Sequence, residues 1–257
     1  MPQASAIESE CAPLPAQEGA LAHTDQSALH NRLLRALDPE EFALLAPHLV
    51  PQSTRLREPL IEPGAPIETC YFVETGIVSV VTARAGSRIE IGMIGREGLV
   101  GAAPVLLGDA RSPHEHFVQM AGEVLGMSAA TLAAIAEAHA GLRRRLLHYV
   151  EAQLVQVSET AHANAMLGLE SRLARWLLMC HDRVGEDELV FTHEFMSMML
   201  GVHRAGLTLT LQNLEGARHI RCRRRRIRIL DRARLEALTE GCYGVAESEY
   251  ARLVEGR

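Results

Sequence analysis

The segment from Leu189 to Asp231, LVFTHEFMSMMLGVHRAGLTLTLQNLEGARHIRCRRRRIRILD, constrains the fold of this chain more than any other. Its first part predicts a short helix, because apolar residues recur there at helical spacing and Thr192 can cap the first amide groups. The apolar positions are Phe195, Met198, Met199 and Leu200. Gly201 follows, and glycine allows the positive φ that a tight turn between two packed helices often requires.

A second helix is predicted directly after this turn. Three leucines at helical spacing form its inward face, namely Leu207, Leu211 and Leu214. The outward face carries His203, Arg204, Thr208 and Gln212. Two such helices form a helix-turn-helix, in which the second helix lies in the major groove of DNA. The alternative is an ordinary helical hairpin with a solvated basic face, which the adjacent arginine-rich segment disfavours.

Seven arginines and no acid lie between residues 218 and 228, in a chain whose formal net charge is -6. The positive charge is therefore local, and it would repel itself unless an anionic partner were present. Ile227, Ile229 and Leu230 alternate with the last arginines, which predicts a β-wing. Phosphate is the expected counter-charge. The predicted DNA contacts are Thr192, His203, Arg204, Thr208 and Gln212 on the helices, and Arg221, Arg223, Arg224, Arg225 and Arg226 on the wing.

Residues 51–124 have a different character, with frequent glycine and proline between short β-branched runs. YFVETGIVSVVT (71–82) predicts two strands around the turn at Glu74 to Gly76, and HFVQMAGEVLGM (116–127) predicts another strand pair. Several strands at this spacing are typical of an antiparallel barrel or sandwich. Before them, residues 27–49 predict two short helices broken near Asp38 and Pro39. Residues 1–26 have no clear period and are expected to be a flexible tail.

A long helix is predicted over residues 141–168, followed by a second amphipathic helix from Leu169 to Asp182 that supports the helix-turn-helix. Gly168 is expected to separate them, because glycine weakens a helix interior. The long helix carries an apolar seam that can face the β domain or a second subunit. We favour a dimer seam, because a reader of palindromic DNA normally needs two copies. The seam residues are Leu146, Tyr149, Val150, Leu154, Val157 and Ala161.

Composition excludes several classes of protein. The chain is 257 residues long and 47% apolar, which is sufficient for one large domain or two smaller ones. Its five cysteines form no CxxC pair or Cys/His cluster, so neither a disulfide framework nor a metal site is expected. No phosphate loop, nucleophile elbow, HExxH or GxGxxG motif is present, which argues against an enzyme. No uninterrupted apolar stretch approaches about 20 residues, so we expect a cytoplasmic protein without a membrane partner.

The order of these elements resembles the Crp/Fnr family of bacterial transcription regulators. The resemblance covers nearly the whole chain after about residue 27. It is carried by YFVETGIVSV, IGREGLVG (94–101), SRLARWLL (171–178), MLGVHR (199–204) and RIRILDRARLEAL (226–238). It implies an α+β fold with a jelly-roll-like antiparallel β-roll of the cyclic-nucleotide-binding type (27–140), a dimerisation helix (141–168) and a winged helix-turn-helix (169–240). Residues 241–257 would then form a C-terminal extension.

The resemblance also implies an effector pocket, but the match there is incomplete. Gly101 lies in the glycine turn, and Ala102 stands where cyclic-AMP-binding members have a glutamate for the ribose. Arg111 and Ser112 resemble the phosphate-binding pair, and Ser158 falls in the segment that contacts the purine. The missing carboxylate removes hydrogen bonds that a ribose needs. We therefore expect no cyclic AMP and no other cofactor, and the sequence does not identify the effector.

The recognition helix departs from the family as well. Arg204 matches the family and can take O6 and N7 of a guanine. Ala205 replaces a glutamate, and Leu209 replaces a second arginine. Arg218 and Arg225 stand where glycines usually end the helix and turn the wing, which is costly if φ is positive. The expected partners are double-stranded promoter DNA, a second copy of the chain and, through the family, RNA polymerase. The alternative is a signalling or interaction protein of the same fold with weak or lost sequence-specific DNA binding.

Overall fold

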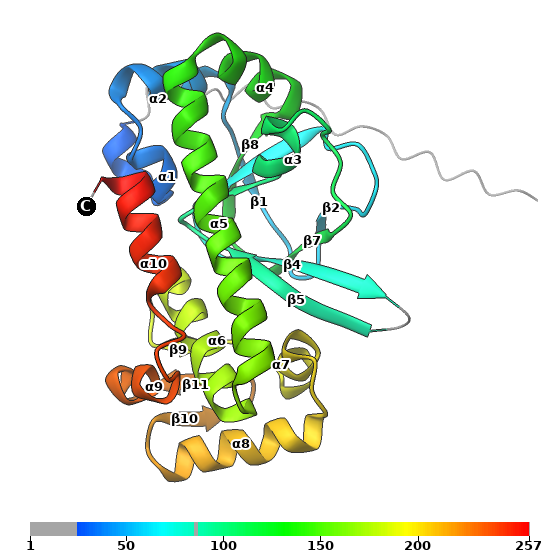
Figure 1. Cartoon of the computed structure of the whole chain (residues 1–257), viewed down its shortest axis with the longest axis vertical. Coiled ribbons are helices and arrows are strands. Elements are labelled where there is room, and N and C mark those ends of the chain that lie inside the picture. Colours follow the sequence, from blue (N-terminus) through cyan, green and yellow to red (C-terminus); the bar gives the residue numbers. More distant parts are fainter. Residues whose placement is uncertain (1–24, 85–86, 257) are drawn as a thin grey trace, which may run out of the picture.

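The computed structural model describes residues 25–84 and 87–256. Residues 1–24 of the expected tail lie outside this range. The β-roll and the winged helix-turn-helix lie at opposite ends of the molecule, and the long helix α5 (Ala140–Met166) runs between them (Figure 1). This architecture is the α+β fold that the sequence predicts.

The chain enters the β-roll through short helical segments. Their bounds are η1 (Gln26–Ala28), α1 (Arg32–Arg35), α2 (Pro39–Leu45) and η2 (Ala46–His48). Asp38 precedes α2, and its backbone amide donates to the Glu41 carboxylate at 3.3 Å. Proline at the first helical position needs no amide partner. The expected break near Asp38 and Pro39 is confirmed.

Two four-stranded antiparallel sheets form the β-roll, in the orders β1-β8-β3-β6 and β2-β7-β4-β5. The strands are β1 (Val50–Ser53), β2 (Pro59–Ile61), β3 (Thr69–Val73), β4 (Ile77–Arg84), β5 (Ser87–Ile94), β6 (Leu99–Val100), β7 (Glu115–Met120) and β8 (Glu123–Ser128). The helices α3 (Ala102–Leu106) and α4 (Ala129–Ala138) belong to the same domain. Ser128 caps α4 by accepting from the Thr131 amide at 3.4 Å.

The predicted strands around Gly76 and Gly122 exist, but their partners differ from those of a simple hairpin. β3 and β4 lie in different sheets, as do β7 and β8. Each turn therefore carries the chain from one sheet to the other, and the two turns pack together. A Cβ at Gly76 would lie 2.5 Å from the Met120 carbonyl oxygen, and one at Gly122 would lie 2.3 Å from that of Thr75. Only glycine permits this approach.

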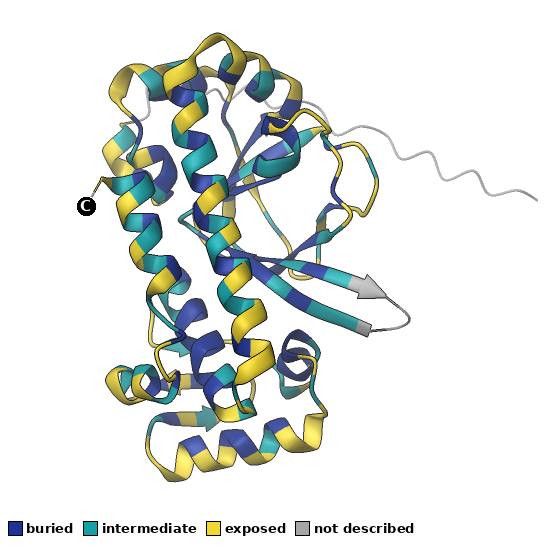
Figure 2. Ribbon diagram, viewed as in Figure 1, coloured by how far each residue is buried: buried dark blue, intermediate teal, exposed yellow. Residues whose placement is uncertain are grey.

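The long helix α5 buries one face against the β-roll of its own chain (Figure 2). Leu146 and Tyr149 are buried in the β-roll core, and Val150 packs against it half-buried. The prediction that Leu146 and Tyr149 contact a second subunit is therefore wrong, because their side chains already face the sheet. Leu154 and Ala161 are exposed, and Val157 is half-buried. The helix ends before Gly168, as expected.

The winged helix-turn-helix packs around leucine, methionine and aromatic side chains, and this core continues into the second sheet of the β-roll through Ile77, Val81, Met93 and Phe117. Its elements are α6 (Leu169–Val184), β9 (Glu188–Leu189), α7 (His193–Leu200), α8 (Arg204–Gly216), β10 (Ile220–Arg223), β11 (Arg226–Ile229) and α9 (Arg232–Leu238). The sequence predicted α6, α7, α8 and the wing, but neither α9 nor β9, which pairs with β11 as a third strand.

The C-terminal extension folds back along α5 toward the start of the β-roll (Figure 1). It consists of α10 (Val245–Tyr250) and a π-helical turn, η3 (Ala251–Glu255). Tyr250 and Val254 are buried in the core of the β-roll. Glu255 forms an ion pair with Arg32 at 2.8 Å. The extension therefore joins the β-roll end of the molecule to the helix-turn-helix end.

Candidate nucleic-acid interface and sensor pocket

The turn between α7 and α8 has the geometry of a helix-turn-helix. The Thr192 hydroxyl caps α7 by accepting from the Phe195 amide at 3.1 Å. Gly201 ends α7 with a φ of 64°, and the Val202 amide donates to the Ser197 carbonyl at 2.9 Å. α8 then begins at Arg204. Both the cap and the positive φ confirm predictions made from the sequence.

The outer face of α8 presents some of the predicted DNA-contacting side chains and not others. His203, Arg204 and Gln212 are exposed. Thr208 is half-buried, and its hydroxyl donates to the Arg204 carbonyl of its own helix at 2.9 Å. Leu209, which we did not predict as a contact, is 60% exposed beside them. The sequence already contained a signal for Leu209, because it lies off the apolar face that Leu207, Leu211 and Leu214 form on the same helix.

The wing places four arginines on one face of the paired strands β10 and β11. Arg221 lies opposite Arg228, and Arg223 lies opposite Arg226, while Ile227 is buried on the other face. Like charges directly opposite each other destabilise an antiparallel pair. An anionic partner would remove this repulsion. Of the four, Arg226 forms an ion pair with Glu188 on β9, and the other three make no salt bridge among the described residues.

Two arginines occupy backbone positions that favour glycine. Arg218 follows the recognition helix with a φ of 61°, and Arg225 turns the wing with a φ of 59°. A side chain with a Cβ is strained in this region. The departures from the family's glycines are therefore real conformational costs at both positions.

The predicted effector residues each have local partners. Gly101 adopts a φ of 87°, and a Cβ there would lie 3.2 Å from the Cys70 sulfur. Ala102 is buried at the start of α3. Exposed Arg111 donates to the Gly64 carbonyl at 2.6 Å, and buried Ser112 accepts from the His114 amide at 3.1 Å.

Ser158, the fifth predicted pocket residue, is exposed on α5 and donates to the Leu154 carbonyl of its own helix at 2.8 Å. Among the described residues, no hydrogen bond joins it to the other four. The effector pocket at these positions stays a prediction.

A buried polar cluster joins the β-roll to α6, and sequence reasoning missed it. Glu90 on β5 accepts from the Trp176 indole at 2.7 Å, and Ser79 lies 2.6 Å from both a Glu90 oxygen and the Gln119 amide oxygen. Burial raises the pKa of Glu90 to about 7, against smaller opposing effects of these hydrogen bonds and of Arg183 and Arg175. Glu90 and Trp176 are 86 residues apart, so no local pattern could pair them.

Other features bear on the class of protein. None of the helices described in residues 25–84 and 87–256 is long and apolar enough to cross a bilayer. Within the same residues, no three histidine, cysteine, aspartate or glutamate side chains gather as metal ligands would.

Comparison with known proteins agrees with this geometry. Residues 51–139 match the model of the cyclic nucleotide-binding domain, and residues 171–238 match that of the Crp-like helix-turn-helix domain. A comparison with curated proteins gave no significant match.

Solved structures share the fold at low sequence identity. A Crp/Fnr-family regulator from Eubacterium rectale is 19% identical with a TM-score of 0.64, covering 82% of this chain and 99% of its own. FixK2 from Bradyrhizobium japonicum is 17% identical with a TM-score of 0.65, covering 74% of this chain and 96% of its own. These structures show the fold alone. The two domain models, which follow each other in this order and together match more than half of the chain, show that the chain belongs to the Crp/Fnr family of transcription regulators.

Proposed function

We propose that the protein regulates promoters as a homodimer, with α8 in the major groove of DNA and the wing on the flanking phosphates. The single observation that carries the proposal is the row of arginines on one face of β10 and β11. Their mutual repulsion is a cost in the free protein that phosphate contacts would remove. Contact with RNA polymerase and a cytoplasmic location belong to the same proposal.

The homodimer would form along the exposed face of α5. Side chains at intervals of three or four residues point away from the β-roll and include the 64%-exposed Leu154. The stripe consists of Glu151, Leu154, Ser158 and Ala161, whereas Leu147, one turn earlier, packs against the β-roll core. This spacing suits packing of two long helices, and its small residues permit close approach. Two copies would present two recognition helices to the half-sites of a palindrome.

Base reading would rest on few side chains. Arg204 is exposed at the start of α8, where its fork can take both acceptors of a guanine. Gln212 and His203 can donate to base edges from the same face. Leu209 stands where the family has a second arginine, and it would contact a thymine methyl group instead of a hydrogen-bond acceptor on a base.

The experiment compares Arg204→Ala with Arg223→Ala on a selected DNA site and on a scrambled duplex. The loss of Arg204 should cost about 1–3 kcal/mol on the selected site and little on scrambled DNA. The loss of Arg223 should weaken both equally and lower the salt slope by about one. Arg252→Ala is the matched control, because Arg252 is exposed on η3 and pairs with Glu249. Equal loss on both duplexes from Arg204→Ala would make Arg204 a phosphate contact.

The Thr208 hydroxyl is engaged with the Arg204 carbonyl of its own helix, which favours a second candidate, an interaction protein without sequence-specific DNA binding. Three observations would establish it together: no preference for any duplex in a selection from random DNA, no effect of Arg204→Ala, and unchanged folding.

A further inference from the structure

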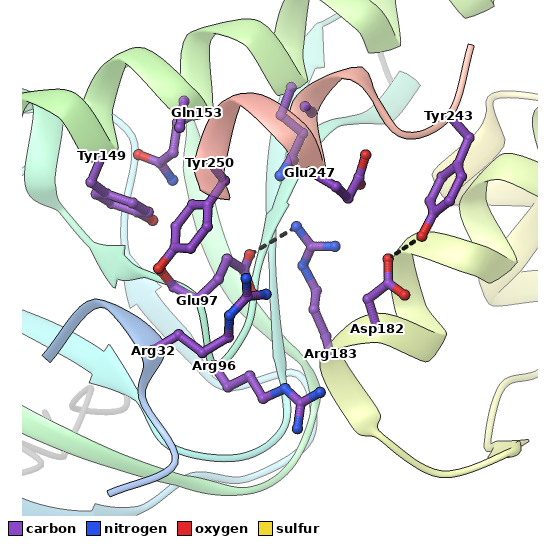
Figure 3. A pocket seen from close by; sticks show the side chains of 13 residues that line it. Arg32, Arg96, Glu97, Tyr149, Gln153, Asp182, Arg183, Tyr243, Glu247 and Tyr250 are labelled. Atoms are coloured by element: carbon purple, nitrogen blue, oxygen red, sulfur yellow. Dashed lines mark hydrogen bonds and ion pairs between the residues drawn. The ribbon is translucent and has the colours of Figure 1, made fainter. Parts of the chain in front are cut away.

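A cavity of about 300 Å³ lies at the junction of the β-roll, α5, α6 and the C-terminal extension (Figure 3). Its volume is at the lower end of the range for small-molecule sites. Arg96 and Glu97 reach it from the turn after β5, Arg183 from α6, and Glu247 and Tyr250 from α10. It is separate from the predicted effector residues at Gly101 to Ser112, none of which lines it.

Two guanidinium groups at this cavity have unused hydrogen-bonding capacity. Arg183 is buried and pairs with Glu97 at 2.8 Å, but its Nε has no hydrogen-bond partner among the described residues. The Arg96 Nε is likewise buried without a partner, and Arg96 makes no ion pair in the described part of the chain. A buried unsatisfied donor is costly, and a positively charged one attracts an anion.

A basic mouth adjoins the cavity. A second hollow of about 600 Å³ shares Arg32 and Arg96 with the first and is lined further by His30, Arg35, Ala36 and Glu255. Three arginines, Arg32, Arg35 and Arg96, line this second hollow together with one glutamate, Glu255. Glu255 already forms an ion pair with Arg32. The unpaired positive charge lies where the two hollows meet.

Aromatic rings line the deeper side. Tyr149 and Tyr250 face the cavity in Figure 3, and their hydroxyls are engaged with the backbone carbonyls of Leu99 at 3.5 Å and Glu97 at 2.8 Å. The Arg32 guanidinium lies over one face of the Tyr250 ring, 4.8 Å from its centre, so the apolar wall consists of Tyr149 and the rest of the Tyr250 ring. Half-buried Gln153 contributes a side-chain amide that makes no hydrogen bond among the described residues. An apolar body with one polar edge would complement this surface.

We propose that this junction binds a small aromatic anion, a carboxylate or a phosphate monoester, with its acid group on Arg96 and its ring against the wall that Tyr149 and Tyr250 form. Arginine takes both acids through paired hydrogen bonds. The walls come from the sensor end, the helix-turn-helix end and the C-terminal extension, so the bound anion holds these units in the present arrangement. A ligand shifts an equilibrium by its differential affinity for the two arrangements, which makes this junction an effector site.

The test is isothermal titration of the full chain, without DNA, with phenyl phosphate and with benzoate. Inorganic phosphate and phenol serve as the acid-only and ring-only probes. Arg96→Gln removes the proposed anchor, and Gln153→Trp fills the cavity from the helix surface. Arg111→Gln is the control, because Arg111 is the exposed arginine at the predicted nucleotide position. Circular dichroism establishes that each variant is folded.

We expect saturable one-to-one binding of at least one aromatic anion, weakened tenfold or more by Arg96→Gln and by Gln153→Trp and unchanged by Arg111→Gln. The relative affinities of phenyl phosphate and benzoate assign the acid group. No saturable binding of either aromatic anion would overturn the proposal, and so would binding that Arg96→Gln leaves intact or that Arg111→Gln abolishes. Binding of inorganic phosphate as tight as that of phenyl phosphate would overturn the aromatic part. The outcome is independent of the DNA-binding proposal, because no DNA is present.

Discussion

Replacing Glu90 with glutamine should stabilise the protein at neutral and alkaline pH. The Ser79 hydroxyl has one proton but lies 2.6 Å from two oxygens, those of Glu90 and Gln119. Protonated Glu90 supplies the missing proton by donating to Ser79, while Trp176 donates to its other oxygen. A glutamine side chain at this position provides one donor and one acceptor in the same places, and it stays neutral at every pH.

The magnitude follows from the pKa of Glu90, which burial raises from 4.5 to about 7. Because the folded-state pKa lies above the unfolded one, the contribution of Glu90 is fully present below pH 4.5 and is lost as the pH rises to about 7. At about 1.36 kcal/mol per pH unit, the loss amounts to about 3 kcal/mol. The new glutamine has a second amide N–H. If this N–H has no hydrogen-bond partner, the increase in the free energy of unfolding is smaller by about 1 kcal/mol.

The assay is urea denaturation at fixed protein concentration from pH 5 to pH 8. The wild-type curve alone is not diagnostic, because burial lowers the pKa of His116 to about 4, from 6.5. His116 therefore contributes stability above pH 6.5 that is lost as the pH falls toward 4, which opposes the Glu90 effect. The difference between Glu90→Gln and wild type isolates Glu90, and it should grow by about 2–3 kcal/mol from pH 5 to pH 8.

The control variant is Glu62→Gln, which makes the same substitution at an exposed glutamate outside the buried cluster. A stability difference between Glu90→Gln and wild type that stays constant across the pH range would refute the reasoning. It would mean that Glu90 is ionised in the folded protein and that a rotated Gln119 amide satisfies Ser79.

Three further predictions concern the dimer, the wing and the sensor. Leu154→Glu should give a monomer in analytical ultracentrifugation, at a cost of several kcal/mol to association if the seam is fully buried; an unchanged dimer would rule out the α5 stripe. Arg225→Gly should stabilise the fold by about 1 kcal/mol, because φ is 59° there, and should lower the salt slope of DNA binding by about one; a destabilised variant would contradict the strain argument. Cyclic AMP should give no thermal shift, whereas a ligand at about 100 times its dissociation constant would add about 2.7 kcal/mol; micromolar binding would show that Ala102 is not a lost ribose contact.

The sequence by itself determined the local features of the DNA-binding end. The cap at Thr192, the turn at Gly201 and the alternation of Arg228 with Ile227 and Ile229 all appear where the sequence predicts them. Capping, positive φ and side-chain periodicity depend on residues a few positions apart, so spacing alone encodes them. The resemblance to the family, rather than local spacing, pointed to a positive φ at Arg225, where the structure has 59°.

Only the tertiary structure decided which surface each apolar or polar face meets. Leu146 and Leu154 belong to one predicted seam, yet the first is buried against the β-roll and the second is exposed. A periodic helix has one apolar pattern, and its partner depends on where the sheet lies. The same holds for Glu90 and Trp176, and for Arg32 and Glu255, which are 223 residues apart. Such pairs form because folding brings distant segments into one low-dielectric interior, and nothing in the neighbouring residues of either partner records the other.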